Sequence, residues 1–199
     1  VHQANMHSTM MFFTEQGRLY WTKVYELPEG NRQSKGRALQ NMINIQKGDK
    51  VCAFIHVKNL SDMEYVQNHY LIFATKNGLM KKTTLESYSR PRTNGIIALG
   101  LREDDRLIRV TLTDGNSQML VASYNGKVVR FPEDTVRPMG RTATGVRAIK
   151  LDEDGKDSVV GMICVEEGSK DSVLVISEKG YGKRTLLDDE NGEPIYRIT

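Results

Sequence analysis

The chain has few of the residues that mark several specialised classes of protein. It contains two cysteines, five prolines and 7% aromatic residues in 199 positions. Two cysteines cannot form a disulfide framework, and Cys52 and Cys164 lie in apolar runs, where a thiol behaves as a small buried hydrophobe. The scarcity of proline, with an ordinary share of glycine, excludes collagen and a low-complexity disordered tail. The composition therefore predicts an ordinary globular chain.

Long apolar runs are also missing. The longest, Met10–Phe13 and Ile96–Leu101, are far shorter than the roughly 18 residues that a membrane-spanning helix needs. The opening residues are polar and do not resemble a secretory signal peptide. We expect a cytoplasmic protein without a membrane partner, whose cysteines stay reduced.

No set of residues has the spacing of a catalytic or metal site. The four histidines are not spaced as metal ligands and have no clustered cysteines or carboxylates beside them. The acidic run that begins at Asp152 has glycine at its fourth position, whereas a calcium-binding loop needs it at the sixth. We expect no catalytic residue, no metal and no cofactor in this chain.

One pattern occurs four times: an apolar run, then Ser or Thr, two further residues and a glycine. These turn glycines are Gly17, Gly78, Gly126 and Gly180, spaced by 48 to 61 residues. The pattern is typical of a buried strand that enters a hairpin, because glycine adopts a positive φ at low cost. It predicts burial of these inner-strand residues: Phe12, Phe13, Ile72, Phe73, Leu120, Val121, Leu174 and Val175.

Each turn glycine is followed by a half-polar strand, and in the first three repeats by a basic loop and two more apolar strands. A second glycine ends each basic loop, at Gly36, Gly95 and Gly145. The half-polar strands are expected over Arg18–Leu27, Leu79–Tyr88, Lys127–Val136 and Tyr181–Leu187. The apolar pairs are expected over Ala38–Ile45 with Val51–Val57, Ile96–Leu101 with Leu107–Leu112, and Val146–Leu151 with Val159–Val165. The first of these also has helix-like spacing, but its counterparts do not, so a strand is predicted.

Four-stranded units at this period predict an all-β, propeller-like array in which each antiparallel blade packs against the next. The predicted blades are residues 10–69, 70–117 and 118–171, with a truncated blade at 172–199. Residues 1–9 are expected to form the closing strand of a preceding blade. The array is therefore predicted to be incomplete.

The small net charge of +3 conceals a segregation. Three windows, Gly17–Arg37, Gly78–Gly95 and Gly126–Arg147, hold 14 basic and 5 acidic residues, a net charge of +9, so the other 138 residues carry −6. Positive charge that recurs along a chain is what a long polyanion-binding surface requires. The pattern favours binding to nucleic acid.

Five segments identify a resemblance to a known family. Gly17–Pro28, Gly126–Phe131, Val136–Gly140, Thr144–Arg147 and Gly180–Thr185 resemble, in the same order, the C-terminal domain of the DNA gyrase A subunit. The resemblance covers essentially the whole chain. It implies a β-pinwheel, a propeller-like fold whose blades exchange strands, with double-stranded DNA wrapped around a basic rim. It also implies a holoenzyme in which the rest of the gyrase A subunit works with the gyrase B subunit. That holoenzyme is an ATP-dependent type II topoisomerase, a DNA gyrase that supercoils DNA negatively.

The chain departs from the family at one motif. The signature heptapeptide Gln-Arg-Arg-Gly-Gly-Lys-Gly is absent, and the corresponding basic loop reads Asn31–Gly36. Two alternatives therefore stay open: the C-terminal domain of the topoisomerase IV A subunit, and a protein-interaction propeller without DNA binding.

The recurring cations are the candidate DNA-binding residues. Each blade is expected to present a strand cation after its turn glycine and loop cations near its second glycine. Such contacts hold phosphates and read no base, so binding should be independent of DNA sequence. Arg147, inside a strand run, is the weakest member. The set is Arg18, Lys23, Arg32, Lys35, Arg37, Lys81, Lys82, Arg90, Arg92, Lys127, Arg130, Arg137, Arg141, Arg147, Lys183 and Arg184.

Overall fold

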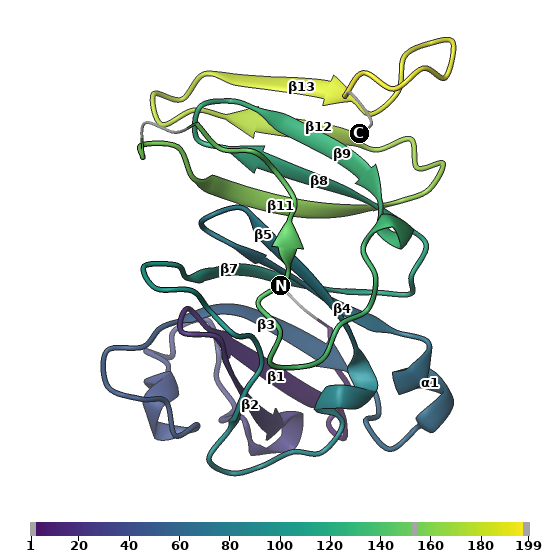
Figure 1. Ribbon diagram of the computed structural model, residues 1–199. Helices are drawn as coiled ribbons and strands as arrows, with labels where there is room; N and C mark the ends of the chain where they lie inside the picture. The colour runs from purple at the N-terminus through teal and green to yellow at the C-terminus, as the bar shows by residue number, and fades with distance from the viewer. Residues whose placement is uncertain (1–2, 153–154, 197–199) are drawn as a thin grey trace.

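The computed structural model describes residues 3–152 and 155–196, and most of their regular structure is β-strand (Figure 1). Within these residues lie one short helix, α1 (Met63–Gln67), and four 3₁₀ turns, η1 (Val24–Glu26), η2 (Leu39–Asn41), η3 (Leu85–Tyr88) and η4 (Glu133–Thr135). The strands are β1 (Thr9–Thr14), β2 (Arg18–Lys23), β3 (Val51–Val57), β4 (Tyr70–Thr75), β5 (Leu79–Thr84), β6 (Ile96–Ile97), β7 (Leu107–Thr113), β8 (Ser117–Ser123), β9 (Val128–Pro132), β10 (Val146–Arg147), β11 (Val159–Glu166), β12 (Ser172–Ile176) and β13 (Gly182–Leu186).

The strands form four antiparallel sheets that stack from the bottom to the top of Figure 1. Their strand orders are β3-β1-β2-β6, β10-β5-β4-β7, β11-β8-β9 and β12-β13. The predicted all-β fold of antiparallel blades is confirmed.

The four predicted hairpins are present, as β1–β2, β4–β5, β8–β9 and β12–β13. Their turn glycines all have φ between 75° and 84°, a conformation that costs other residues about 1 kcal/mol. The second strand of each hairpin is shorter than expected. In the first three hairpins it is followed directly by η1, η3 or η4, which turns the chain out of the sheet.

The sheets bury apolar side chains between them. Phe13 of the first sheet meets Phe73 of the second edge to face, with ring centroids 5.6 Å apart. Six of the eight predicted inner-strand residues are buried, which confirms the prediction for β1, β4 and β8. The prediction is wrong for Leu174 and Val175, which are 61% and 55% exposed. Their sheet has two strands among the described residues, so little covers its faces.

Two short strands cross from one unit to the sheet of the preceding one. β6 pairs with β2, and β10 pairs with β5. The longer strands expected over Ile96–Leu101 and Val146–Leu151 are therefore wrong in length. Each pairing stops after two residues because the chain bends over the turn glycine of the preceding unit. There the Gly17 carbonyl accepts a hydrogen bond from the Ala98 N–H at 2.8 Å, and the Gly78 carbonyl accepts one from the Ala148 N–H at 2.9 Å.

The strand expected over Ala38–Ile45 is also wrong. In the repeat, this segment corresponds to β6 and β10. Those strands pair with the second hairpin strand of the preceding unit. The described residues contain no hairpin before β1 with which this segment could pair. It forms the turn η2 instead. Ile43 packs into a small cluster with Met10, Phe12 and Tyr20.

The segment before β1 behaves differently from the expected closing strand. Residues 3–8 contain a turn and no strand. The Met6 and Ser8 carbonyls accept hydrogen bonds from the N–H groups of Tyr25 and Val24, so this segment lies against its own blade. The part of the prediction that falls on residues 1–2 lies outside the described residues. The blade boundaries stay predictions. β6 and β10 each lie within the residue range of one predicted blade but pair with the sheet of the preceding blade.

The second glycines allow the exchanged strands to approach closely, and this can be tested. A Cβ on Gly145 would lie 2.3 Å from the Met80 carbonyl oxygen, and its φ is +98°. Gly36 also has a positive φ, of +69°, but no atom within 4 Å of such a Cβ. We expect Gly145→Ala to lower the free energy of unfolding by about 2–4 kcal/mol and Gly36→Ala by about 1 kcal/mol. Urea denaturation of both variants measures the difference; equal losses would contradict the close approach.

Candidate nucleic-acid interface

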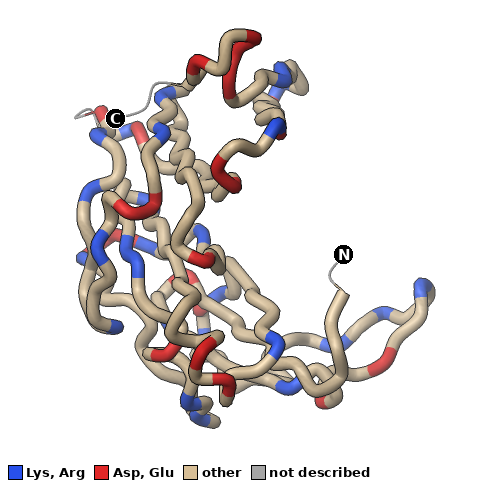
Figure 2. Tube along the Cα trace, turned by 90° about the vertical axis from the view of Figure 1, so that its right-hand side faces the viewer, with Lys and Arg blue, Asp and Glu red and all other residues tan. Residues whose placement is uncertain are grey.

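The basic loops lie at one edge of the sheets. β6 and β10 form one edge of their sheets, whereas β3, β7 and β11 form the opposite edges, and β7 contacts both β3 and β11. The loops that lead into β6 and β10 are therefore at the rim, away from the packed inner edge. Figure 2 shows the chain as an open arc, with several Lys and Arg positions along its outer side. This rim has the shape and charge for a long anionic partner.

Most of the predicted DNA-binding residues are on the surface. Three are half-buried: Arg18, Lys23 and Arg141. Ten are exposed: Arg32, Lys35, Arg37, Arg90, Arg92, Lys127, Arg137, Arg147, Lys183 and Arg184. Arg147 is exposed because β10 is an edge strand of its sheet.

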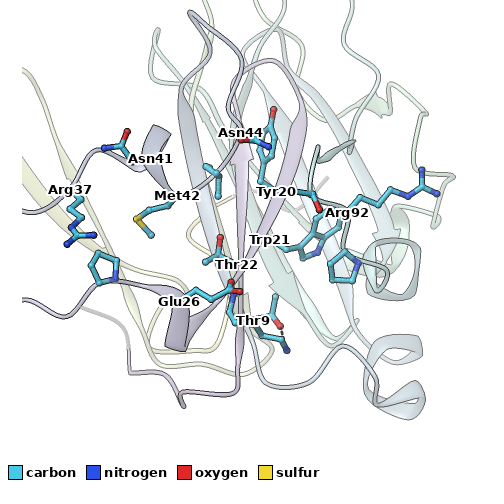
Figure 3. Close-up of a pocket in the computed structure, with 15 residues that line it drawn as sticks. Thr9, Tyr20, Trp21, Thr22, Glu26, Arg37, Asn41, Met42, Asn44 and Arg92 are labelled. Atoms are coloured by element: carbon cyan, nitrogen blue, oxygen red, sulfur yellow. Dashed lines mark hydrogen bonds between the residues drawn. The ribbon is translucent and has the colours of Figure 1, made fainter.

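A groove of about 1090 Å³ lies between two of the basic loops. Its floor is β2, with Tyr20, Trp21 and Thr22 (Figure 3). Arg37 and Arg92 stand on opposite sides of this floor, one from each loop (Figure 3). Neither arginine forms an ion pair with another residue that the structure describes. Both guanidinium groups are exposed at the borders of the groove, and Arg92 extends outward from its floor (Figure 3).

Three surface cations are held by neighbours in the protein. Arg18 donates to the Asn94 carbonyl at 3.1 Å and so supports the loop that carries Arg92. Lys23 donates to the Thr9 hydroxyl at 3.1 Å. Lys127 pairs with Asp152, and this hydrogen bond holds the pKa of the Asp152 carboxyl below its usual range. These three are less free to reach a phosphate than Arg37 and Arg92.

Three of the predicted DNA-binding residues are buried, and the prediction is wrong for them. Lys81 is 0% exposed, Lys82 5% and Arg130 7%. A side chain enclosed in this way cannot contact a phosphate on the surface. Each forms hydrogen bonds or ion pairs inside the protein instead.

Lys82 joins the second sheet to the third. Its Nζ lies 2.9 Å from Glu133 Oε1, and both side chains are almost completely enclosed. The Thr113 hydroxyl and the Ser117 N–H also donate to Glu133, at 2.7 and 3.3 Å. The Lys82 ammonium further lies 4.3 Å from the centroid of the Tyr70 ring. The buried carboxylate and ammonium thus compensate one another, as buried charges must.

Arg130 makes the equivalent connection one unit later. Its guanidinium donates to the Leu187 carbonyl at 3.0 Å and to Asp188 at 2.7 Å, both just after β13. Lys82 and Arg130 each lie four residues after a turn glycine. At the same place in the first unit, Trp21 Nε1 donates to the Tyr88 carbonyl at 3.2 Å. We call this fourth residue after the turn glycine the latch position, because in the first three units its side chain contacts the next unit.

From the sequence, the cations at the latch position were predicted to bind DNA, and their contact with the next unit was missed, although a signal for it was present. The carboxylates Glu133 and Asp188 stand just after the second strand of the following unit, at nearly the same place in the repeat. Arg184 occupies the fourth latch position. It is exposed, and its side chain forms no hydrogen bond or ion pair with a described residue, so its predicted role in DNA binding remains a prediction.

The two cysteine thiols are not activated as nucleophiles. Burial raises the pKa of the Cys52 and Cys164 thiols to about 12, so both stay protonated near neutral pH. Residues 3–152 and 155–196 hold no group of three metal-ligating side chains. No helix among them has the length and apolar content to cross a membrane.

Stacked antiparallel blades that exchange short edge strands, with basic loops along one rim, define the β-pinwheel class. The chain belongs to the DNA gyrase C-terminal domain family, a β-propeller family whose model matches residues 8–58, 69–114, 118–166 and 171–189. The resemblance to the gyrase A subunit is thereby confirmed.

Known relatives agree with this assignment. The DNA gyrase A subunit of Salmonella typhimurium is 45% identical over 186 residues, which cover 94% of this chain. That of Staphylococcus aureus is 45% identical over 92% of this chain. The chain spans 20% of the length of these relatives. Among solved structures, the C-terminal domain of DNA topoisomerase IV is 28% identical with a TM-score of 0.80, covering 98% of this chain and 57% of its own. A DNA gyrase A C-terminal domain has a TM-score of 0.71 at 24% identity, covering 91% of this chain and 55% of its own, and supports the fold.

Proposed function

We propose that this chain binds double-stranded DNA along its basic rim, without sequence preference, and bends the duplex around the arc. The observation that carries the proposal is the groove bordered by Arg37 and Arg92, since exposed guanidinium groups on both sides of one surface can each contact a phosphate of a bound duplex. The exposed Arg137 and Arg147 continue the positive surface into the next unit. Among the described residues, no helix is long enough to enter a major groove and read base edges.

Within a larger protein, this activity would serve DNA supercoiling. We propose that the chain acts in the cytoplasm as the DNA-wrapping part of the gyrase A subunit, with the gyrase B subunit supplying ATP-dependent strand passage. The match to gyrase A subunits at 45% identity over most of this chain supports this choice over topoisomerase IV. The rim here would supply the geometry of the wrapped segment rather than any step of bond cleavage.

The proposal predicts a strong salt dependence of binding. A random-sequence duplex should bind with a logarithmic salt slope of about −0.9 for each phosphate contact, so about six contacts give a slope near −5. Fluorescence anisotropy from about 50 to about 200 mM salt measures the slope. Two unrelated duplexes of the same length should bind equally. Binding that does not change with salt, or no binding at all, would favour a protein-interaction propeller instead.

A further inference from the structure

A buried lysine, Lys81, connects two segments of the chain that lie next to basic loops of the rim. Lys81 lies on β5 and is 0% exposed. Its Nζ donates to the Ala98 carbonyl at 2.6 Å and to the Arg141 carbonyl at 2.5 Å. The Tyr88 hydroxyl is 3.3 Å from the same nitrogen, and the Phe73 ring centroid is 4.7 Å from it. The ammonium therefore has three oxygen partners and an aromatic neighbour inside the fold.

The two carbonyls belong to different loops. Ala98 directly follows β6, which the basic loop of Arg90 and Arg92 precedes. Arg141 is part of the loop that leads into β10. A further hydrogen bond, from the Gly100 N–H to the Ala143 carbonyl at 3.3 Å, joins the same two segments. One ammonium group thus links loop 139–145 to the segment that directly follows β6, and through the two residues of β6 to the end of loop 89–95.

The connection extends to the floor of the groove. The Tyr88 hydroxyl donates to the Ala98 carbonyl at 2.9 Å, and the Tyr88 carbonyl accepts from Trp21 Nε1. Trp21 lines the groove between Arg37 and Arg92. The corresponding residues of the first, third and fourth units are Tyr20, Val129 and Lys183, and Lys183 is exposed, so among the described residues a buried lysine occupies this place at this junction alone. A residue that only filled space here could be apolar, as Val129 is.

We propose that Lys81 is a positioning residue for DNA binding: it holds loops 89–95 and 139–145 at the spacing that lets their cations contact one duplex together. The inference rests on the proposed function. Lys81 itself contacts no DNA. Its effect passes through the backbone carbonyls of Ala98 and Arg141, so the number of simultaneous phosphate contacts depends on it.

The protonation of Lys81 gives this role a distinctive signature. Burial, and then the charge of Arg141, lower the pKa of Lys81 to about 7. The other titratable group that faces it, Tyr88, stays a neutral hydroxyl because burial raises its pKa. Loss of the proton leaves two N–H donors for the two carbonyls, and these hydrogen bonds lose the strength that a charged donor gives them. The hold on the loops, and with it DNA affinity, should weaken as the pH rises through about 7.

Protein stability should change in the opposite direction. Between the folded pKa of about 7 and the ordinary value of 10.5, the unfolded chain binds the Lys81 proton and the folded chain does not. Stability therefore rises with pH in this window, relative to a variant without the lysine. A lysine with a structural role only would give the stability change without any loss of affinity.

The experiment compares wild type, Lys81→Met and a matched buried variant in the same sheet, Ile72→Val. Affinity for a random duplex is measured from about pH 6 to about pH 8.5, with the salt slope at each pH and thermal unfolding as a check of folding. We expect Lys81→Met to bind about tenfold more weakly at pH 6, with a slope smaller by about two and no pH dependence near 7. Ile72→Val should keep the wild-type slope. An unchanged slope in Lys81→Met, or the same pH profile in Lys81→Met and wild type, would overturn the proposal.

A second measurement separates this inference from the proposed function and covers poor folding of Lys81→Met. Tyr88→Phe removes one oxygen partner of Lys81 and keeps the ring. Hydrogen exchange of the Gly100 amide, which spans the two segments, should be faster in Lys81→Met and in Tyr88→Phe than in Ile72→Val, with no DNA present. Equal exchange in all three would refute the positioning role. If wild type fails to bind DNA while exchange is faster as expected, the proposed function fails and the connection between the loops stands.

Discussion

Replacing the five exposed cations of the groove loops with alanine is expected to weaken duplex binding by about 100-fold or more at 100 mM salt. These residues form no ion pair with one another or with the rest of the described chain, so their charges are free to displace counterions from DNA. The salt slope should fall by about 0.9 for each contact that is lost. All duplex sequences should be affected alike, because the contacts read no base. The residues are Arg32, Lys35, Arg37, Arg90 and Arg92.

The control for this variant removes exposed cations elsewhere. Lys58 and Lys170 are exposed. Lys58 directly follows β3 and Lys170 lies four residues after the end of β11, and both strands are at the packed inner edge of their sheets. Lys58→Ala with Lys170→Ala should leave the salt slope within experimental error. Both variants should remain folded in urea denaturation, since surface substitutions change stability by about 0.5 kcal/mol or less each, at most about 2.5 kcal/mol for the five together. A loop variant that binds with the wild-type slope would refute the assignment of this groove. In the complete enzyme, the loop variant should lose supercoiling and keep DNA cleavage.

The second large effect is on stability. Lys82→Ala would leave the Glu133 carboxylate enclosed, with the Thr113 hydroxyl and the Ser117 N–H as its remaining partners among the described residues. Removing one member of a buried ion pair costs about 3–5 kcal/mol, because the remaining charge is uncompensated. We expect a loss of that size in the free energy of unfolding, measured by urea denaturation.

Two further variants test the cause of that loss. Adding Glu133→Gln to Lys82→Ala should recover part of the stability, since the amide carries no charge and can still accept from Thr113. Arg184→Ala removes the cation at an equivalent latch position that has no partner in the described chain, and should cost about 0.5 kcal/mol or less. Equal losses of unfolding free energy in Lys82→Ala and Arg184→Ala would show that the Lys82–Glu133 ion pair is not the cause of the loss.

Much of the fold could be predicted from the sequence because its signals are local. A buried strand followed by a glycine turn is a matter of neighbouring residues, and all four hairpins form where the pattern places them. The exchange of β6 and β10 could not be obtained in this way. It depends on which strand of another unit lies beside Gly95 or Gly145, and in the first unit the same kind of segment, around Leu39, forms a 3₁₀ turn instead.

The candidate site was predicted less completely, and for a physical reason. A lysine that binds phosphate and a lysine that pairs with a buried carboxylate are the same letter in the sequence. Lys82 and Arg130 are buried because neighbouring sheets cover their strands, and their carboxylate partners lie 51 and 58 residues further along the chain. Arg147 shows the converse. Its strand-like surroundings suggested burial, but an edge strand leaves the guanidinium exposed.

The latch position also limits how such a chain can change in length during evolution. Each latch reaches only the adjacent unit, so the gain or loss of a whole unit would preserve every remaining junction. A single inserted residue between Val128 and Arg130 would act differently. It would shift the strand by one place, put an uncharged residue at the latch position, turn Arg130 to the opposite face of its sheet and leave Asp188 without its cation. Variation among such arrays should therefore occur in multiples of one blade, or in loops outside the four residues that separate glycine from latch.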